Sequence, residues 1–387
     1  MSEPEGQRAP RRRAGKQSEP GAARLTRIGV GGDRPYEVVV GAGAVGELPL
    51  LVGQEAAAVV VIHPAALGQL ARPVCQVLRD AGYRVHAEQI PDGEAAKDVT
   101  VAAGLWSRLA AHGLGRRDAI VGVGGGAATD LAGFTAATWL RGVRLALVPT
   151  TLLAVVDAAV GGKTAINIAE GKNLVGAFHT PAGVLADPAM LASLPGREYV
   201  SGLAEVIKAG FIADPAILEL IEADPEAAAR PGGPNERELI ERAVRVKAAV
   251  VSDDLREAGP REMLNYGHTL GHAIERAEGY RVRHGAAVSI GMVYAAAVAR
   301  RAGRLDEATE KRHRAILAAV GLPIGYRPGA WPRLREAMAV DKKSRARALR
   351  LVVLDALARP GILNDPPEQL LEQAYEETAG AGEVGGG

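Results

Sequence analysis

The chain has 387 residues, of which 48% are hydrophobic and 24% are charged. This length favours two domains of ordinary size, and the composition is typical of a globular protein with enough apolar material for a core. The net charge of +1 excludes a strong overall field for nucleic acid or an anionic membrane, and no apolar run is long enough to span a bilayer. We therefore expect neither a nucleic-acid partner nor a membrane partner.

The two ends of the chain differ in composition from the rest. Residues 1–25 contain the basic run RRRAGK without an apolar segment, so we expect a disordered basic tail and not a secretory signal. Residues 376–387 end in GEVGGG and are also expected to be unstructured. The single cysteine, Cys75, excludes an internal disulfide and suits a reducing compartment, which indicates a cytoplasmic location.

Short apolar segments alternate with helical stretches between residues 26 and 190. Strands are expected at 38–40, 58–62, 83–90, 119–123 and 145–149, with helices such as 67–81 and 100–109 between them. Nearly continuous apolar strands that alternate with helices predict a parallel sheet covered on both faces. The sequence thus predicts an N-terminal nucleotide-binding α/β domain.

A glycine-rich turn follows one of these strands. Residues 120–130 read IVGVGGGAATD, a strand followed by three glycines and the start of a helix. Glycines let a backbone approach a pyrophosphate closely, and a helix N-terminus adds partial positive charge. The match to the G-x-G-x-x-G fingerprint is poor, and a tight turn is the alternative, but the strand–turn–helix context favours nucleotide binding.

Cationic side chains gather in the next segment. Lys163, Lys172 and Asn173 stand in GGKTAIN and GKNLVGAF, which we interpret as glycine-punctuated loops. Surface lysines are the common alternative, but their concentration here favours a phosphorylated ligand.

Helical periodicity dominates from residue 191 to residue 375. Helices are expected at 203–212, 216–222, 236–253, 261–276, 286–302 and 307–319, with a loop at 224–234. This pattern predicts a second, mostly helical domain, and a cleft at the join between the domains is a common place for a ligand.

The expected helices carry the most informative polar residues. Glu205 and Lys208 lie one turn apart on an apolar helix, either as an ion pair or as a metal ligand beside a substrate-binding lysine. Asn265, His268 and His272 would share one face of the helix expected at 261–276, and His284 could return from a second element. Glu205, His268 and His284 would form a His₂Glu metal site.

Four of the five histidines outside this cluster, His63, His86, His112 and His313, are best explained as satisfied core or surface residues.

The segments that carry these residues resemble the 3-dehydroquinate synthase family. They read GGGAATDLAGFTAATWLRG, VPTTLLAVVDAAVGGKTAIN, GKNLVGAFHTP, LPGREYVSGLAEVIKAG, LNYGHTLGHAIE and RHGAAVSIGM. They cover most of residues 35–360 in the family's order. The resemblance implies an N-terminal NAD⁺-binding α/β domain with a parallel sheet, and a mostly helical metal-binding domain.

The resemblance also implies a role for each matching position. The metal ligands, for Zn²⁺ or Co²⁺, are Glu205, His268 and His284. The NAD⁺ positions are Glu94, Lys97, Gly125, Gly126, Asp130, Thr150, Thr151 and Lys172. The substrate positions are Arg141, Lys163, Asn173, Lys247, Arg261, Asn265 and either Lys342 or Lys343. The catalytic positions are Asp157, Lys208, Glu257 and His272. Arg141 matches an arginine that reaches the partner's site in a homodimer.

The family converts 3-deoxy-D-arabino-heptulosonate 7-phosphate into 3-dehydroquinate and phosphate, and regenerates its NAD⁺. Two alternatives share parts of the pattern: an aminocyclitol-type sugar phosphate cyclase, whose substrate lacks a carboxylate, and a metal-dependent polyol dehydrogenase, which consumes NAD⁺. Lys247, Arg261 and Asn265 favour the dehydroquinate branch. A catalytically inactive binding protein would be expected to have lost a metal ligand or Lys163, and none is lost.

Overall fold

The computed structural model describes residues 25–254, 259–343 and 349–380, without the side chains of residues 260 and 339–343. Residues 1–24 of the tail expected at 1–25, residues 381–387 of the tail expected at 376–387, and the predicted catalytic residue Glu257 lie outside these ranges. The side chains of Lys342 and Lys343 also lie outside the described part.

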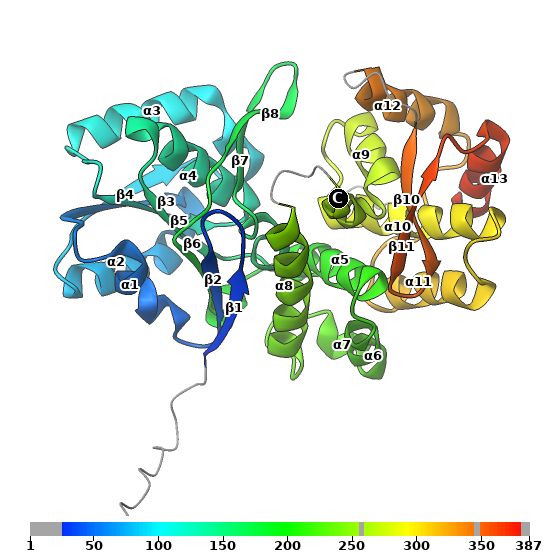
Figure 1. Cartoon of the computed structure of the whole chain (residues 1–387), viewed down its shortest axis with the longest axis horizontal. Coiled ribbons are helices and arrows are strands. Elements are labelled where there is room, and N and C mark those ends of the chain that lie inside the picture. The colour runs from blue at the N-terminus through cyan, green and yellow to red at the C-terminus, as the bar shows by residue number, and fades with distance from the viewer. Residues whose placement is uncertain (1–24, 255–258, 344–348, 381–387) are drawn as a thin grey trace, which may run out of the picture.

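The N-terminal half contains a seven-stranded sheet (Figure 1). In spatial order its strands are β1 (Thr26–Val30), β2 (Tyr36–Val40), β9 (Gly183–Ala186), β6 (Arg144–Pro149), β5 (Ala119–Gly124), β3 (Ala58–Pro64) and β4 (Arg84–Ile90). All neighbours pair in parallel except β1 and β2, which form an antiparallel hairpin at one edge. The predicted parallel α/β architecture is confirmed.

Helices cover both faces of this sheet (Figure 1). Helices α1 (Leu48–Val52) and α2 (Gly68–Asp80) pack on one face, and α3 (Val99–Ala111) and α4 (Gly126–Thr138) pack on the other. The chain therefore leaves the neighbouring strands β3 and β5 toward opposite faces. Such a reversal creates the crevice at the carboxyl ends of parallel strands in which nucleotides bind.

The segment with Lys163, Lys172 and Asn173 differs from its prediction. It forms an antiparallel hairpin of β7 (Lys163–Ile168) and β8 (Gly171–Phe178), so these side chains lie on strands and not in loops. Strand β7 also packs closely on α4, since a Cβ on Gly133 would lie 2.4 Å from Thr164 Cγ2.

The C-terminal half is mostly helical, as predicted. Its helices are α5 (Gly196–Ile212), α6 (Ala216–Ala223), α7 (Pro225–Ala228), α8 (Glu236–Asp253), α9 (His268–Ala277), α10 (His284–Arg301), α11 (Glu307–Ala319), α12 (Trp331–Lys343) and α13 (Glu368–Thr378). A hairpin of β10 (Arg350–Ala356) and β11 (Arg359–Asn364) was not predicted, and α7 lies in the expected loop at 224–234. Helix α13 also runs three residues past the expected end of the domain at 375. Within the described residues, no helix is both long and apolar enough to cross a membrane.

The single helix expected at 261–276 is wrong. A 3₁₀ segment, η7 (Pro260–Asn265), ends before Tyr266, and α9 begins only at His268. Gly267 between them has a φ of 80°, which breaks a right-handed helix. It also packs tightly on α10, because a Cβ there would lie 2.8 Å from Met292 Cγ and 2.9 Å from Val288 O. Asn265 and His268 therefore do not belong to one continuous helix.

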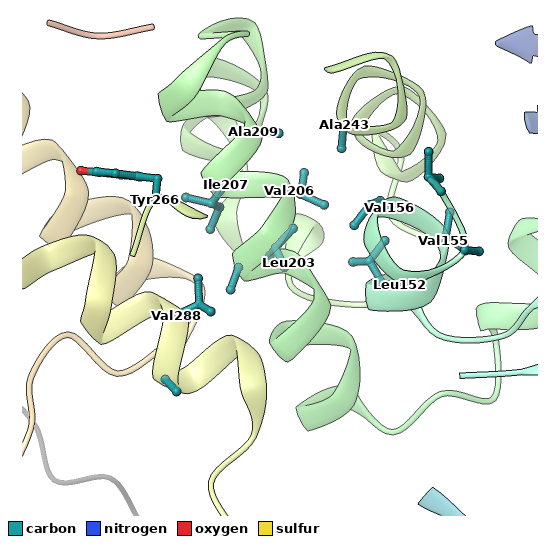
Figure 2. Packing of buried hydrophobic residues seen from close by; sticks show 14 of the residues in the cluster. Leu152, Val155, Val156, Leu203, Val206, Ile207, Ala209, Ala243, Tyr266 and Val288 are labelled. Carbon is teal, nitrogen blue, oxygen red and sulfur yellow. The ribbon is translucent and has the colours of Figure 1, made fainter. Parts of the chain in front are cut away.

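Helix α5 joins the two halves (Figure 2). Leu203 and Val206 face Leu152 and Val156 of the segment that follows β6, and Ile207 on another side of α5 lies beside Tyr266. A Cβ on Gly202 would lie 2.5 Å from the backbone nitrogen of Leu153, so the helix and this segment are in direct backbone contact. The buried charges of α5 are thereby placed at the boundary between the sheet half and the helical half.

Candidate active site

Three predicted metal ligands lie together. Ligand atoms of Glu205 on α5, His268 at the start of α9 and His284 at the start of α10 are all within 4.8 Å of one another. The Nε2 atoms of His268 and His284 lie 3.6 Å and 3.5 Å from Glu205 Oε1. That oxygen is buried and has no hydrogen-bond partner among the described residues. An orphaned carboxylate oxygen between two imidazole nitrogens fits a divalent metal.

Lys208 is the cation closest to this cluster. It is ion-paired with the other carboxylate oxygen of Glu205, and its Nζ donates to the carbonyl of Leu264 at 2.7 Å. Burial alone would raise the pKa of Glu205, but Lys208 and the two histidines outweigh it and hold the pKa well below its usual range. Glu205 is therefore an ionised ligand. Both readings of Glu205 and Lys208, the ion pair and the metal ligand, fit the same geometry.

A hydrogen bond orients each histidine of the cluster. His268 Nδ1 donates to the carbonyl of Tyr266 at 3.1 Å, which leaves its Nε2 lone pair facing Glu205. Burial, aided by Lys208, lowers the pKa of His268 well below its usual range. His284 Nδ1 lies 3.4 Å from Glu275 Oε1. The neutral His268 is ready to act as a ligand.

Glu275 was not among the predicted site residues. Burial would lower the pKa of His284, but the carboxylates of Glu205 and Glu275, at 3.5 Å and 3.4 Å from its two ring nitrogens, outweigh it and raise the pKa to about 10. A carboxylate behind a metal-binding histidine is a common orienting group. Its spacing of one turn from His272 on the same helix was the signal that could have found it.

His272 lies beside the cluster. Its ring centroid is 5.2 Å from that of His268 and 6.4 Å from that of His284, and its side chain is exposed to solvent. It is absent from the group of ligand atoms. This position suits a group that exchanges protons with a ligand in the site.

A second group of charges lies next to the metal cluster. Asp157 is ion-paired with Lys247 of α8. Burial and Glu205 act to raise the pKa of Asp157, but Lys247 and Lys208 outweigh them and lower it. Burial lowers the pKa of Lys247, and Asp157 acts against that shift. Arg261 is buried nearby, with Nη2 at 3.0 Å from the position that a Cβ on Gly161 would occupy. The structure brings the charges of Asp157, Lys208, Lys247 and Arg261 close to one another.

The glycine turn after β5 has the features of a phosphate site. Gly125 is the N-cap of α4 and offers no side chain to the first N–H groups of that helix. A Cβ on Gly125 would lie 3.1 Å from Thr151 Cγ2, and one on Gly126 would lie 3.2 Å from Ala158 Cβ. Thr150 Oγ1 is buried without a partner among the described residues. Free helix N–H groups and an orphaned hydroxyl fit an anionic nucleotide.

The other predicted nucleotide residues surround this turn. Lys97 is buried, donates to Asp130 at 2.6 Å and also bonds Asn173. Burial raises the pKa of Asp130 to about 6, although Lys97 acts against it. Glu94 accepts from Asn167 at 2.7 Å and lies 3.6 Å from Lys172 Nζ. Lys172 Nζ also lies 4.1 Å from the ring centroid of Tyr280, so the β8 strand contacts the helical half.

Three of the predicted substrate-binding residues lie at exposed or half-buried positions. Arg141 is exposed in a turn with a φ of 70°, and no hydrogen bond or ion pair joins it to another described residue. Lys163 is exposed at the start of β7, and Asn265 is half-buried at the end of η7. The side chains of Glu257 and Lys342 lie outside the described part of the chain, so the roles predicted for them stay predictions.

Sequence comparisons match most of the chain. The family model described as 3-dehydroquinate synthase N-terminal matches residues 87–201, and the one described as 3-dehydroquinate synthase C-terminal matches residues 202–344. A 3-dehydroquinate synthase of Thermobifida fusca is 66% identical over 357 residues, which cover 92% of this chain and 97% of that protein.

Two solved structures share the architecture. A 2-deoxy-scyllo-inosose synthase complexed with carbaglucose-6-phosphate, NAD⁺ and Co²⁺ has a TM-score of 0.82 and 28% identity, and covers 92% of this chain and 100% of its own. A 2-epi-5-epi-valiolone synthase from Streptomyces hygroscopicus subsp. jinggangensis with NAD⁺ and Zn²⁺ bound has a TM-score of 0.81 and 26% identity, over 89% and 96% of the two chains.

Proposed function

The chain belongs to the 3-dehydroquinate synthase family, and we propose that it converts 3-deoxy-D-arabino-heptulosonate 7-phosphate into 3-dehydroquinate and phosphate. It is then a carbon–oxygen lyase of the shikimate pathway, which leads to the aromatic amino acids. The observation that carries the proposal is the Glu205, His268 and His284 cluster, placed beside the buried cations at the boundary of the two halves.

The proposal assigns one cofactor to each half of the molecule. Residues 26–190 would bind NAD⁺ and residues 191–375 the metal and the substrate. NAD⁺ supplies a reversible hydride acceptor, and Zn²⁺ or Co²⁺ on Glu205, His268 and His284 supplies a Lewis acid. The glycine turn at Gly125 and Gly126 and the orphaned hydroxyl of Thr150 support the nucleotide site.

The side chains of the chain itself perform the remaining tasks. Arg261 and Lys247 would bind the substrate carboxylate, because a guanidinium can hold a carboxylate through two parallel hydrogen bonds. The phosphate would be held by Lys163, Asn173, Asn265, His272 and Arg141, and the exposed His272 would also carry protons near neutral pH. Lys208 and Asp157 would keep the substrate oriented between the metal cluster and the side chains of Lys247 and Arg261. The resemblance implies a catalytic role for Glu257 and a substrate-binding role for either Lys342 or Lys343, and we keep both roles in the proposal.

The substrate class can be tested against that of the closest rival, the aminocyclitol-type cyclase. We expect zinc-loaded protein with NAD⁺ to release phosphate from 3-deoxy-D-arabino-heptulosonate 7-phosphate. Glucose 6-phosphate lacks the carboxylate that Arg261 and Lys247 would bind, so we expect its kcat/KM to be lower by at least about 100-fold. Release from glucose 6-phosphate alone would contradict the proposal and favour the rival.

We also propose a homodimer in which Arg141 reaches the partner's site. Arg141 has no partner of its own among the described residues, and Gly142 lies beside His179 at the end of β8. On that strand Leu174 and Phe178 are 63% and 49% exposed. An apolar surface next to an unpaired arginine supports a subunit contact. We place the enzyme in the cytoplasm, where the free Cys75 would stay reduced.

A further inference from the structure

His313 is a buried histidine with both ring nitrogens in use. It lies on α11 with an exposed fraction of 0%. Its Nδ1 is 2.8 Å from the carbonyl of Thr309, and its Nε2 is 2.9 Å from the hydroxyl of Tyr266. A carbonyl can only accept, so Nδ1 carries the proton and Nε2 accepts from the Tyr266 O–H. The sequence-based interpretation of His313 as a satisfied core residue is therefore confirmed, but its contacts extend further.

Tyr266 connects His313 to the metal cluster. Its side chain is fully buried, and Figure 2 shows its ring extending from the segment beside Ile207 of α5, with the hydroxyl at the far end. Its backbone carbonyl accepts the Nδ1–H of His268 at 3.1 Å. That hydrogen bond directs His268 Nε2 toward Glu205. The position of one peptide carbonyl thus sets the orientation of a proposed metal ligand.

His313 also contacts the helix that carries Glu205. Its ring stacks on Phe211 of α5, with centroids 3.5 Å apart and planes 10° apart. Lys208 of the same helix donates to the carbonyl of Leu264, two residues before Tyr266. His313 therefore lies between the two elements that supply Glu205 and His268.

The next peptide after Tyr266 needs an anchor. Gly267 has a φ of 80° and no side chain to fix it, so the Tyr266 carbonyl depends on its neighbours for its direction. A Cβ on Gly291 would lie 1.8 Å from the carbonyl oxygen of Gly267, so α10 limits the Gly267 peptide from one side. On the other side, the Tyr266 hydroxyl is held by His313 Nε2 at 2.9 Å and lies at a longer 3.5 Å from the carbonyl of Met292.

We propose that the Tyr266–His313 hydrogen bond is a positioning device for the metal site, which fixes the Tyr266 carbonyl and through it the ring of His268. This inference rests on the proposed function, because it takes Glu205, His268 and His284 as metal ligands. Neither Tyr266 nor His313 touches the metal or the substrate in this account. Loss of a group that orients a ligand typically weakens metal binding about 10-fold to 100-fold.

The test measures Co²⁺ binding to the metal-free full-length protein by competition with a chelator, together with the visible spectrum of bound Co²⁺. Tyr266→Phe removes the hydroxyl and keeps the ring, and His313→Leu removes both ring nitrogens. His313→Gln can still accept from Tyr266 and donate to Thr309. Tyr375→Phe is the matched control. Tyr375 lies on α13, which is separate from α5 and α9 (Figure 1), and its buried hydroxyl donates to the carbonyl of Arg327 at 2.6 Å.

We expect Tyr266→Phe and His313→Leu to bind Co²⁺ about 10-fold or more weakly and to change its spectrum. His313→Gln should recover much of the affinity, and Tyr375→Phe should lose thermal stability without losing affinity. If His313→Leu does not fold, Tyr266→Phe decides the matter. Wild-type affinity for Co²⁺ in Tyr266→Phe, or an equal loss of affinity in Tyr375→Phe, would overturn this inference but leave the proposed metal site standing. A wild-type protein that binds no Co²⁺ would overturn the metal site as well.

Discussion

At the scale of single residues, burial gives His313 a different proton affinity in the folded and unfolded chains. Burial lowers its pKa to about 4, with Arg312 as the charged neighbour acting in the same direction, whereas the unfolded value is near 6.5. The unfolded chain therefore takes up a proton first as the pH falls. The stability that the neutral, buried His313 contributes to the folded protein is fully present above pH 6.5 and is lost progressively as the pH falls toward 4.

This shift makes a measurable prediction. Between pH 7 and pH 5 the free energy of unfolding of the wild type should fall by about 2 kcal/mol relative to that of His313→Leu. Urea titrations of both proteins at the two pH values give this difference, in which the other titrating groups cancel. A difference that does not change with pH would show that His313 is not neutral in the folded protein.

Much of the site could be predicted at this scale. Glu205, His268 and His284 were identified from residue type and order, because few side chains can bind a metal and they stand in recognisable segments. Glu275 and Tyr266 were not. Glu275 lies behind His284, and Tyr266 acts through its carbonyl. Such roles depend on three-dimensional contacts that residue type does not reveal.

At the scale of elements, Gly267 decides where α9 begins. Gly267→Ala would place a Cβ in a left-handed residue and within 2.9 Å of Met292 N and Val288 O. Gly303 is a matched control, because its φ is 71° but nothing lies within 4 Å of its Cβ position. Strain alone should cost Gly303→Ala about 1–2 kcal/mol, and overpacking should cost Gly267→Ala about 1–3 kcal/mol more. Denaturant unfolding measures both, and equal losses would contradict the close packing of α9 on α10.

Most regular elements could be predicted from the sequence, but the helix break at Gly267 and the β7–β8 hairpin could not. Strands β2 to β6 and helices such as α8 and α11 were predicted because apolar periodicity follows burial closely. The break at Gly267 was missed because NYGHTLGHA also suits a continuous helix. The β7–β8 hairpin was missed because its glycines resemble loop residues, whereas its strand pairing and its packing on α4 are three-dimensional contacts.

At the scale of the whole molecule, a shared site can be tested by complementation. We expect Arg141→Ala and His268→Ala each to be inactive alone, since one lacks the arginine for the partner and the other a metal ligand. In a mixed dimer, the subunit with His268 receives Arg141 from its partner and forms one complete site. Random mixing should therefore restore roughly a quarter of wild-type activity, because half of the dimers are mixed. Activity in Arg141→Ala alone, or none in the co-refolded mixture, would contradict the shared site.

A cyclase regenerates its own NAD⁺, and this property separates it from a dehydrogenase. Zinc-loaded protein is given 3-deoxy-D-arabino-heptulosonate 7-phosphate and a trace of NAD⁺, and phosphate and NADH are followed together. We expect phosphate far in excess of the NAD⁺ supplied, with no accumulation of NADH. NADH that rises in step with substrate consumption would instead identify a dehydrogenase.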